Sequence, residues 1–291
     1  MTATKARRHE EEKDSPKHSL RSPRSPPFDL AQGIPSLSRD AFIVVDFEKS
    51  RGFRGQMTSE AIKEAARDLE TASAADIVRW AADRFAPRLT FATSLGIEDC
   101  LVTDLIARAK LPVDLFTLDT ELLFPETYAL WKRIEEKYGV TIKAVKPART
   151  VAEQASAEGP ALWTREPDRC CDLRKMRPLG ATLANYDAWI TAIRRDQTPE
   201  RANAPVVGWD GRFGLVKINP LVRWTSDQVR AYVAEHEVPY NPLHDRNYPS
   251  IGCMPCTSPV MPGEDSRSGR WRGQEKTECG LHLRIPVRAE S

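Results

Sequence analysis

Short apolar runs alternate with helix-like segments through the middle of this 291-residue chain, and that alternation restricts the fold more than any other feature. β-rich runs at 89–93, 114–118 and 141–145 are separated by helical patterns at 98–109 and 125–138. Strands that alternate with helices form βαβ units, in which neighbouring strands run parallel. The sequence therefore predicts an α/β fold built on a mainly parallel sheet.

The same pattern continues on both sides of this stretch. The apolar run 188–193 predicts a further strand, and 206–218 has the pattern of a hairpin. Thr58 and Ser73 are suitable helix N-caps, and a last helix is expected over 225–236.

Composition divides the chain into three parts. Residues 1–55 combine mixed charges with a run rich in Arg, Ser and Pro, a composition that cannot bury a core and predicts a disordered arm. Residues 56–240 hold the predicted α/β domain. Residues 241–291 are rich in Pro, Gly, Cys and Arg without periodicity, which predicts a loop-built C-terminal segment.

Charge and hydropathy exclude two classes of partner. The formal net charge is +2, too small for the many phosphate contacts of a nucleic-acid binder. No apolar run approaches the roughly 18 residues of a membrane-spanning helix, so no membrane association is expected. The N-terminus lacks the apolar stretch of a secretory signal, which favours a cytoplasmic location.

Four cysteines form two tight pairs, Cys170 with Cys171 and Cys253 with Cys256. Without a secretion signal, such cysteines indicate metal or thiol chemistry rather than disulfides. Four thiolates can hold either a tetrahedral zinc ion or an iron–sulfur cluster. Adjacent cysteines are unusual zinc ligands, so the pattern favours a [4Fe–4S] cluster, with zinc or unliganded thiols as alternatives.

The two remaining cysteines differ in their surroundings. Cys100 lies among apolar residues of a predicted helix, which indicates a core position. Cys279 is flanked by Lys276 and His282, and nearby cations favour the reactive thiolate form. Cys279 is therefore a candidate nucleophile, with an inert surface cysteine as the alternative.

Several residues have the chemistry to bind a small anion. Ser94 and Gly96 lie in a turn between a predicted strand and helix, where a phosphate or sulfate can bind. Arg194 and Arg195 follow the strand at 188–193, at the sheet edge where α/β proteins bind ligands. Their forked guanidinium groups suit an oxyanion, although ordinary salt bridges are the alternative. A further basic set lies between the second cysteine pair and Cys279 and could clamp the same anion: Arg267, Arg270 and Arg272.

Together these segments resemble the assimilatory adenylyl-sulfate and phosphoadenylyl-sulfate reductases, which reduce activated sulfate to sulfite with thioredoxin. The resembling segments are 94–99, 118–120, 124–128, 194–197 and 278–282. The resemblance implies a Rossmann-like, adenine-nucleotide alpha-hydrolase-like domain over 56–240. It also implies that 241–291 carries the second cysteine pair and a catalytic tail.

The resemblance assigns roles to particular residues. The two cysteine pairs are similar to the [4Fe–4S] ligands of members that use adenylyl sulfate. Cys279 resembles the nucleophile that forms an S-sulfocysteine, with His282 orienting it or shuttling a proton. The implied substrate-binding residues are Ser94, Gly96, Lys175, Arg194, Arg195, Arg267 and Arg270.

The match to that family has departures and leaves alternatives. Glu121 stands where the family often has glycine, and Pro249 where it often has an aliphatic residue. A phosphoadenylyl-sulfate reductase is one alternative, and a non-reducing nucleotide-binding protein with a structural zinc is another. Thioredoxin is expected to be a separate protein, because the chain ends shortly after His282. The sequence leaves open whether the chain forms a homo-oligomer.

Overall fold

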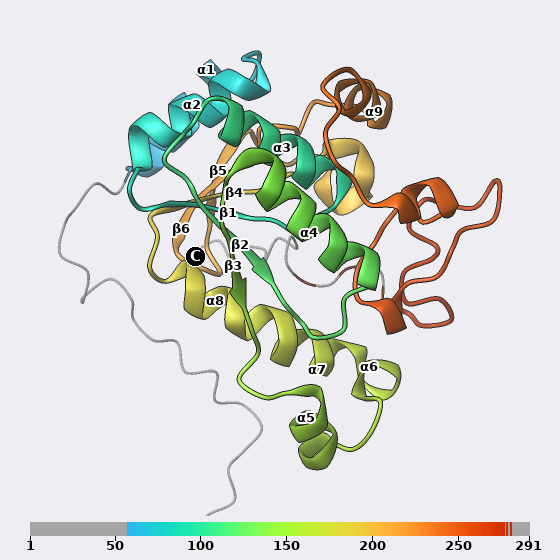
Figure 1. Ribbon diagram of the computed structural model, residues 1–291. Coiled ribbons are helices and arrows are strands. Elements are labelled where there is room, and N and C mark those ends of the chain that lie inside the picture. The colour runs from blue at the N-terminus through green and yellow to red at the C-terminus, as the bar shows by residue number, and fades with distance from the viewer. Residues whose placement is uncertain (1–56, 277, 279, 281–291) are drawn as a thin grey trace, which may run out of the picture. The chain divides into compact units, whose positions relative to one another are not determined.

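The computed structural model describes residues 57–276, 278 and 280. Within them, six strands form one sheet in the order β3-β2-β1-β4-β6-β5 (Figure 1). The strands are β1 (Leu89–Ala92), β2 (Asp114–Leu118), β3 (Ile142–Val145), β4 (Ala188–Ile190), β5 (Val207–Asp210) and β6 (Leu215–Ile218). Every neighbouring pair is parallel except β5 with β6, which form the predicted hairpin. The expected mainly parallel α/β fold is confirmed.

Helices connect and cover these strands. They are α1 (Ser59–Asp68), α2 (Ala74–Phe85), α3 (Ile97–Arg108), α4 (Pro125–Tyr138), α5 (Val151–Glu158), α6 (Leu162–Arg165), α7 (Pro167–Cys171), α8 (Arg177–Leu183) and α9 (Ser226–Glu235). The side chains of Thr58, Ser73 and Thr225 accept hydrogen bonds from the first turns of α1, α2 and α9, as N-caps do. None of the helices in the described part of the chain has the length and apolar character that crossing a membrane requires.

The two faces of the sheet bury different side chains, because successive residues of a strand point to opposite sides. Leu115 joins the larger core, to which α2, α3, α4 and α9 contribute, whereas its neighbour Phe116 joins a smaller one. In that smaller core Trp189 packs with Leu179 and Leu183 of α8. Figure 1 shows α3 and α4 on one side of the sheet and α8 on the other.

Two regions differ from the expectations or go beyond them. The strand predicted at 188–193 ends at Ile190, and residues 191–193 beyond it line a cavity. Residues 146–187, which the sequence patterns left unassigned, form α5 to α8 and a π-helical turn (Asp172–Met176) directly after the first cysteine pair.

The C-terminal segment up to residue 276 is built largely from loops. It contains two short 3-10 turns, Pro242–Arg246 and Met254–Cys256, and a single bridge between Thr257 and Arg270. The amide of Met254 donates to the Leu122 carbonyl after β2, which fixes the second cysteine pair near the sheet edge.

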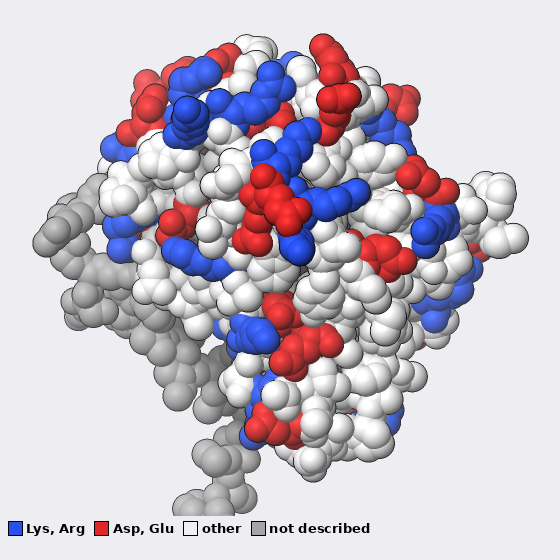
Figure 2. Space-filling view, viewed as in Figure 1, with Lys and Arg blue, Asp and Glu red and all other residues white. Residues whose placement is uncertain are grey.

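Surface charge is mixed on the face seen in Figure 2. Lysine and arginine side chains are interleaved with aspartate and glutamate across it. On this face the described residues therefore present no extended surface of one sign.

Candidate active site

A cavity of about 370 Å³ lies where β1, β2 and β4 end. Its lining includes residues 92–94 and 96–99 at and after β1, residues 117, 118 and 120 at and after the end of β2, and residues 189, 191–194, 196 and 197 at and after β4. The chain passes from β1 to β2 on one side, while β4 pairs with β1 on the other. Ligands of α/β proteins bind at such a change in strand order, outside the carboxyl ends of the strands. Residues of the C-terminal segment form the remaining wall.

The turn after β1 lines the cavity, but a carboxylate of the protein already occupies its donors. The backbone amides of Ser94 and Gly96 donate to Asp99 Oδ2 at 2.9 and 3.2 Å, and the Ser94 hydroxyl also bonds to it. Burial raises the pKa of the Asp99 carboxyl to about 6. Ser94 and Gly96 thus lie where the sequence predicted, with donors directed at Asp99 rather than free for an anion.

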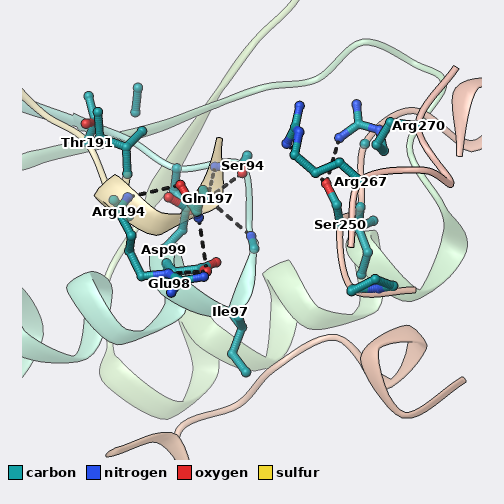
Figure 3. Close-up of a pocket in the computed structure, with 18 of the residues that line it drawn as sticks. Ser94, Ile97, Glu98, Asp99, Thr191, Arg194, Gln197, Ser250, Arg267 and Arg270 are labelled. Carbon is teal, nitrogen blue, oxygen red and sulfur yellow. Dashed lines mark hydrogen bonds and ion pairs between the residues drawn. The ribbon is translucent and has the colours of Figure 1, made fainter. Parts of the chain in front are cut away.

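The paired arginines after β4 diverge. Arg194 lines the cavity, but its guanidinium contacts Glu98 at 3.0 Å and Asp196 at 2.7 Å (Figure 3). Arg195 is not among the residues that line the cavity, and its guanidinium makes two hydrogen bonds to Glu70, at 2.6 and 3.0 Å. The structure therefore brings Arg194 to the site with its charge balanced by acids, and places Arg195 against α1 and its C-terminal turn.

The opposite end of the cavity is basic. Arg267 and Arg270 each direct Nη1 at Ser250 Oγ, at 3.4 and 3.3 Å (Figure 3). Arg270 lies so close to Gly252 that a Cβ there would overlap its guanidinium group. Lys175, from the π-helical turn, lines the same cavity. Three predicted cations from two distant segments of the sequence therefore converge on one cavity, as binding of a multiply charged anion requires.

The two cysteine pairs converge from α7 and the C-terminal segment. Cys170, Cys171 and Cys253 are buried, and Cys256 is partly buried. Burial raises the pKa of the Cys256 thiol to about 12, and the other three thiols add to this effect because like charges repel. Lys175 opposes it. The four sulfurs are thus close enough to influence one another, beside the basic end of the cavity.

The cysteines do not form a closely packed site for a single metal ion. Among residues 57–276, 278 and 280, no group of three or more His, Cys, Asp or Glu side chains is arranged to hold such an ion. A [4Fe–4S] cluster takes its ligands on separate irons, so it does not require four sulfurs around a single ion. Four thiols from two segments supply the donors that such a cluster needs.

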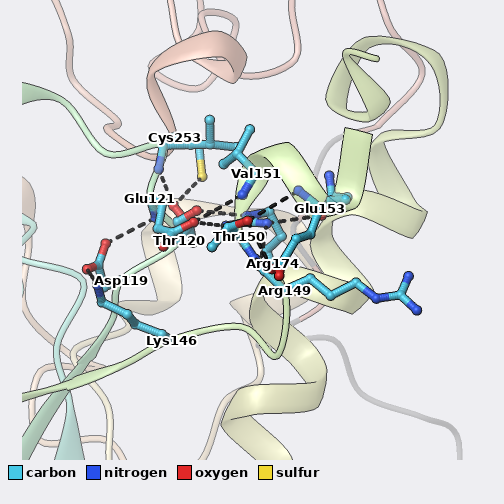
Figure 4. A network of polar contacts seen from close by, with 12 residues as sticks. Asp119, Thr120, Glu121, Lys146, Arg149, Thr150, Val151, Glu153, Arg174 and Cys253 are labelled. Atoms are coloured by element: carbon cyan, nitrogen blue, oxygen red, sulfur yellow. Dashed lines mark hydrogen bonds and ion pairs between the residues drawn. The ribbon is translucent and has the colours of Figure 1, made fainter. Parts of the chain in front are cut away.

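A buried arginine organises the residues around the cysteines. Arg174 is 1% exposed and donates to the Thr120 carbonyl at 2.7 Å, to Gln154 Oε1 at 3.2 Å and to Glu121 Oε2 at 3.0 Å (Figure 4). A guanidinium group can be buried only when its donors are satisfied in this way. Arg174 therefore ties the loop after β2 to α5 and to the π-helical turn.

Two of its partners also contact cysteines. Thr120 Oγ1 lies 3.2 Å from Cys253 Sγ, and Gln154 Nε2 lies 4.0 Å from Cys170 Sγ. Each pair of cysteines thus has a polar neighbour that is positioned by the same guanidinium group. Such outer contacts orient the ligands of metal sites.

Glu121 explains one departure from the family pattern. Its φ is 58°, in the left-handed region where glycine is favoured. Its carboxylate accepts hydrogen bonds from Arg174 and from the backbone amide of Val151. The side chain that replaces glycine is therefore stabilised by two donors.

Three predictions concern residues away from this cluster. Cys279 and His282 lie outside the described residues, so their assigned roles remain predictions. Cys100 is fully buried in the larger core, as expected.

Sequence reasoning missed several residues of the cavity wall. Arg201 and Glu278 lie within it as a buried ion pair with a 3.0 Å contact. His244 is also buried there, neither ring nitrogen has a hydrogen-bond partner among the described residues, and burial lowers its pKa. Glu278 begins the segment 278–282 that resembles the family, and this membership is the sequence signal that points to it. Arg201 and His244 have no sequence signal that separates them from ordinary surface residues.

The fold and the cavity define the class of protein. A mainly parallel α/β sheet with a basic cavity at the carboxyl ends of its strands is typical of nucleotide-binding proteins. The chain belongs to the phosphoadenosine phosphosulfate reductase domain family, whose model matches residues 88–259. That range contains both cysteine pairs and Lys175.

Individual relatives agree with this assignment. The chain is 47% identical over 222 residues to the adenosine 5'-phosphosulfate reductase of Halalkalibacterium halodurans, covering 76% of this chain and 96% of that protein. It is also 47% identical to the adenosine 5'-phosphosulfate reductase of Streptomyces coelicolor, covering 78% and 97%. Among solved structures, it resembles the phosphate complex of phosphoadenylyl-sulfate reductase from Candida auris, with a TM-score of 0.63, 33% identity, and 70% and 98% coverage.

Proposed function

We propose that this chain reduces adenosine 5'-phosphosulfate to sulfite and AMP, using thioredoxin as a separate reductant in the cytoplasm. Relatives that share 47% of their residues with it carry the name of that activity. The observation that carries the proposal is the convergence of Lys175, Arg267 and Arg270 on one cavity beside the four cysteines. A phosphosulfate group bears two negative charges, which these cations balance.

In the proposed complex, the phosphosulfate lies at the basic end of the cavity. The Nη1 groups of Arg267 and Arg270, which now point at Ser250, are in reach of an anion there. The adenosine lies toward the turn after β1, where Ser94 and Gly96 line the wall. The donors of that turn remain with Asp99, so they shape the nucleotide pocket rather than bind the anion.

Chemistry proceeds by two displacements at sulfur. The Cys279 thiolate attacks the sulfate sulfur, a bond forms between the two sulfur atoms, and the bond from sulfur to the AMP oxygen breaks with its electron pair on AMP. A thioredoxin thiolate then attacks Cys279 Sγ and displaces sulfite, leaving a mixed disulfide. The second thioredoxin thiolate resolves that disulfide and restores Cys279. The dithiol supplies both electrons, and His282 orients the nucleophile or moves its proton.

Cys170, Cys171, Cys253 and Cys256 would hold a [4Fe–4S] cluster. When bound, such a cluster would supply fixed charge and a rigid support next to Lys175. Thr120 and Gln154 would orient two of the cysteine ligands, because their side chains already contact Cys253 and Cys170. Four irons and four acid-labile sulfides per chain in anaerobically purified protein are expected. One zinc ion per chain, in protein purified under conditions that exclude the loss of a labile cluster, would instead support a non-reducing protein with a structural zinc.

The covalent step is tested by intact mass spectrometry. Protein mixed with adenosine 5'-phosphosulfate and no reductant should gain one SO3 group, which peptide mapping places on Cys279. Cys279→Ser is the variant that should not gain it, while Cys100→Ser, at a buried core position, should retain the adduct. An adduct on another cysteine, or sulfite formation by Cys279→Ser, would contradict the mechanism.

A further inference from the structure

Glu278 carries a buried negative charge at the basic end of the cavity. It is 6% exposed, and its carboxylate oxygens accept hydrogen bonds from Arg201 Nη2 at 3.0 and 3.1 Å and from Arg267 Nη2 at 3.1 Å. All three residues line the cavity. A carboxylate is kept this far from water only where paired charges hold it. The contact therefore fixes the backbone at residue 278 to the cavity wall.

A second contact fixes the chain two residues further on. The carbonyl of Gly280 accepts a hydrogen bond from Arg212, which lies in the turn between β5 and β6. Arg212 is itself oriented by Asp210 at the end of β5. The polypeptide is thus held at residue 278 by two arginines of the cavity wall and at residue 280 by the turn between β5 and β6.

The ion pair with Glu278 and the contact with Ser250 use different nitrogens of Arg267. Glu278 uses Nη2 of Arg267, whereas Nη1 of Arg267 and Nη1 of Arg270 are directed at Ser250. Lys175 also remains on the cavity wall. A phosphosulfate can therefore bind while Glu278 stays paired.

We propose that Glu278 is a positioning residue, which anchors the backbone next to Cys279 on Arg201 and Arg267 and thereby controls how fast the Cys279 thiolate attacks the substrate sulfur. This inference rests on the proposed function. Glu278 does not react and need not touch the substrate. It acts through the two arginines and the backbone that it anchors, so its loss slows attack without weakening nucleotide binding.

The test compares Glu278→Gln and Glu278→Asp with Glu275→Gln, a matched control. Glu275 lies on the same segment, is exposed and does not line the cavity. Three quantities are measured: the single-turnover rate of S-sulfocysteine formation, the dissociation constant of AMP, and the rate at which N-ethylmaleimide alkylates Cys279 without substrate. Iron content and melting temperature are recorded for each variant.

We expect Glu278→Gln to slow S-sulfocysteine formation roughly 100-fold, because small displacements of a reacting group have effects of that size. Its AMP dissociation constant should stay within about threefold of wild type, and alkylation should accelerate roughly tenfold because a docking ion pair is lost. Glu278→Asp should recover part of the rate, since it keeps the charge. Glu275→Gln should behave as wild type.

Three results would overturn the proposal. These are equal rates of adduct formation in Glu278→Gln and Glu275→Gln, equal alkylation rates in the two, or a fall in melting temperature and iron content that accounts for the slower reaction. If wild-type protein forms no sulfite or adduct from adenosine 5'-phosphosulfate, the proposed function fails. The alkylation rates would still decide whether Glu278 docks the segment.

Discussion

Arg174 allows a quantitative test of how the region around the cysteines is held together. Arg174→Met keeps much of the side-chain volume but removes the donors that bond to Thr120, Gln154 and Glu121. The Thr120 carbonyl and the Gln154 oxygen would then lack their partner in a buried region, and the Glu121 carboxylate would lose its ion pair.

The expected cost follows from the burial of these groups. Leaving one buried polar atom unsatisfied costs about 1–3 kcal/mol, and breaking a buried ion pair about 3–5 kcal/mol. Glu121 is 28% exposed, so water partly compensates its carboxylate. We therefore expect a loss of about 4 kcal/mol. At about 2–4 °C per kcal/mol for a domain of this size, the melting temperature should fall by roughly 8–16 °C.

A second substitution makes the test specific. Glu121→Gly relieves the left-handed backbone at residue 121, worth about 1–2 kcal/mol. In the wild-type background this gain is offset by loss of the contact with Arg174, so the net change should be near zero. In the Arg174→Met background, Glu121→Gly also removes an unpaired carboxylate and should stabilise the protein by about 1–2 kcal/mol.

The assay is anaerobic urea denaturation of all four proteins, followed by circular dichroism and accompanied by iron analysis. The same effect of Glu121→Gly in both backgrounds would show that Glu121 and Arg174 are not energetically coupled. A cost below about 1 kcal/mol for Arg174→Met would refute it as well, because surface substitutions already have effects of nearly that size.

Three further predictions concern individual residues. Arg195→Ala should cost about 1 kcal/mol of stability through loss of its ion pair with Glu70 and leave the AMP dissociation constant unchanged. Arg270→Ala should instead weaken AMP binding at least tenfold, because Arg270 lines the cavity. Equal AMP binding by the two variants would contradict the assignment of the basic end. Gly252→Ala should displace the Arg270 guanidinium and weaken AMP binding with little change in melting temperature, and unchanged AMP titrations would count against that contact. The raised pKa of Asp99, about 6, means that the native state favours the protonated carboxyl, so this contribution is present below pH 4 and is lost as the pH rises through 6. The stability of Asp99→Asn relative to wild type should therefore increase by roughly 2 kcal/mol between pH 4 and pH 7. A difference in urea denaturation that stays constant over this pH range would show that the pKa of Asp99 is not raised.

Local patterns predicted the sheet because each strand carries its own signal. Alternation in β2 places Leu115 and Phe116 on opposite faces, and the caps at Ser73 and Thr225 mark helix starts. The strand at 188–193 was predicted too long, since Ile193 is apolar and buried yet lies beyond the sheet. Hydrophobicity reports burial and does not distinguish a strand from a cavity wall.

The candidate site was predictable only where residue type alone decides the chemistry. Arg267 and Arg270 were predicted at an anion site, and both line the cavity. Arg194 and Arg195 looked equivalent in sequence, but their partners come from distant elements, Glu98 on α3 and Glu70 just after α1. Long-range pairing of this kind has no local signature. The same reason explains why Arg201 escaped notice.

Steady-state sulfite release decides whether the chain is an adenosine 5'-phosphosulfate reductase. Reconstituted protein is supplied with reduced thioredoxin and equal concentrations of either adenosine 5'-phosphosulfate or its 3'-phosphorylated form, with Arg270→Ala as the binding-defective control. We expect sulfite and AMP in equal amounts from adenosine 5'-phosphosulfate, with a much lower rate from the 3'-phosphorylated nucleotide. A preference for the 3'-phosphorylated nucleotide would make the chain a phosphoadenylyl-sulfate reductase, and sulfite from neither nucleotide would show that it is not a reductase of this kind.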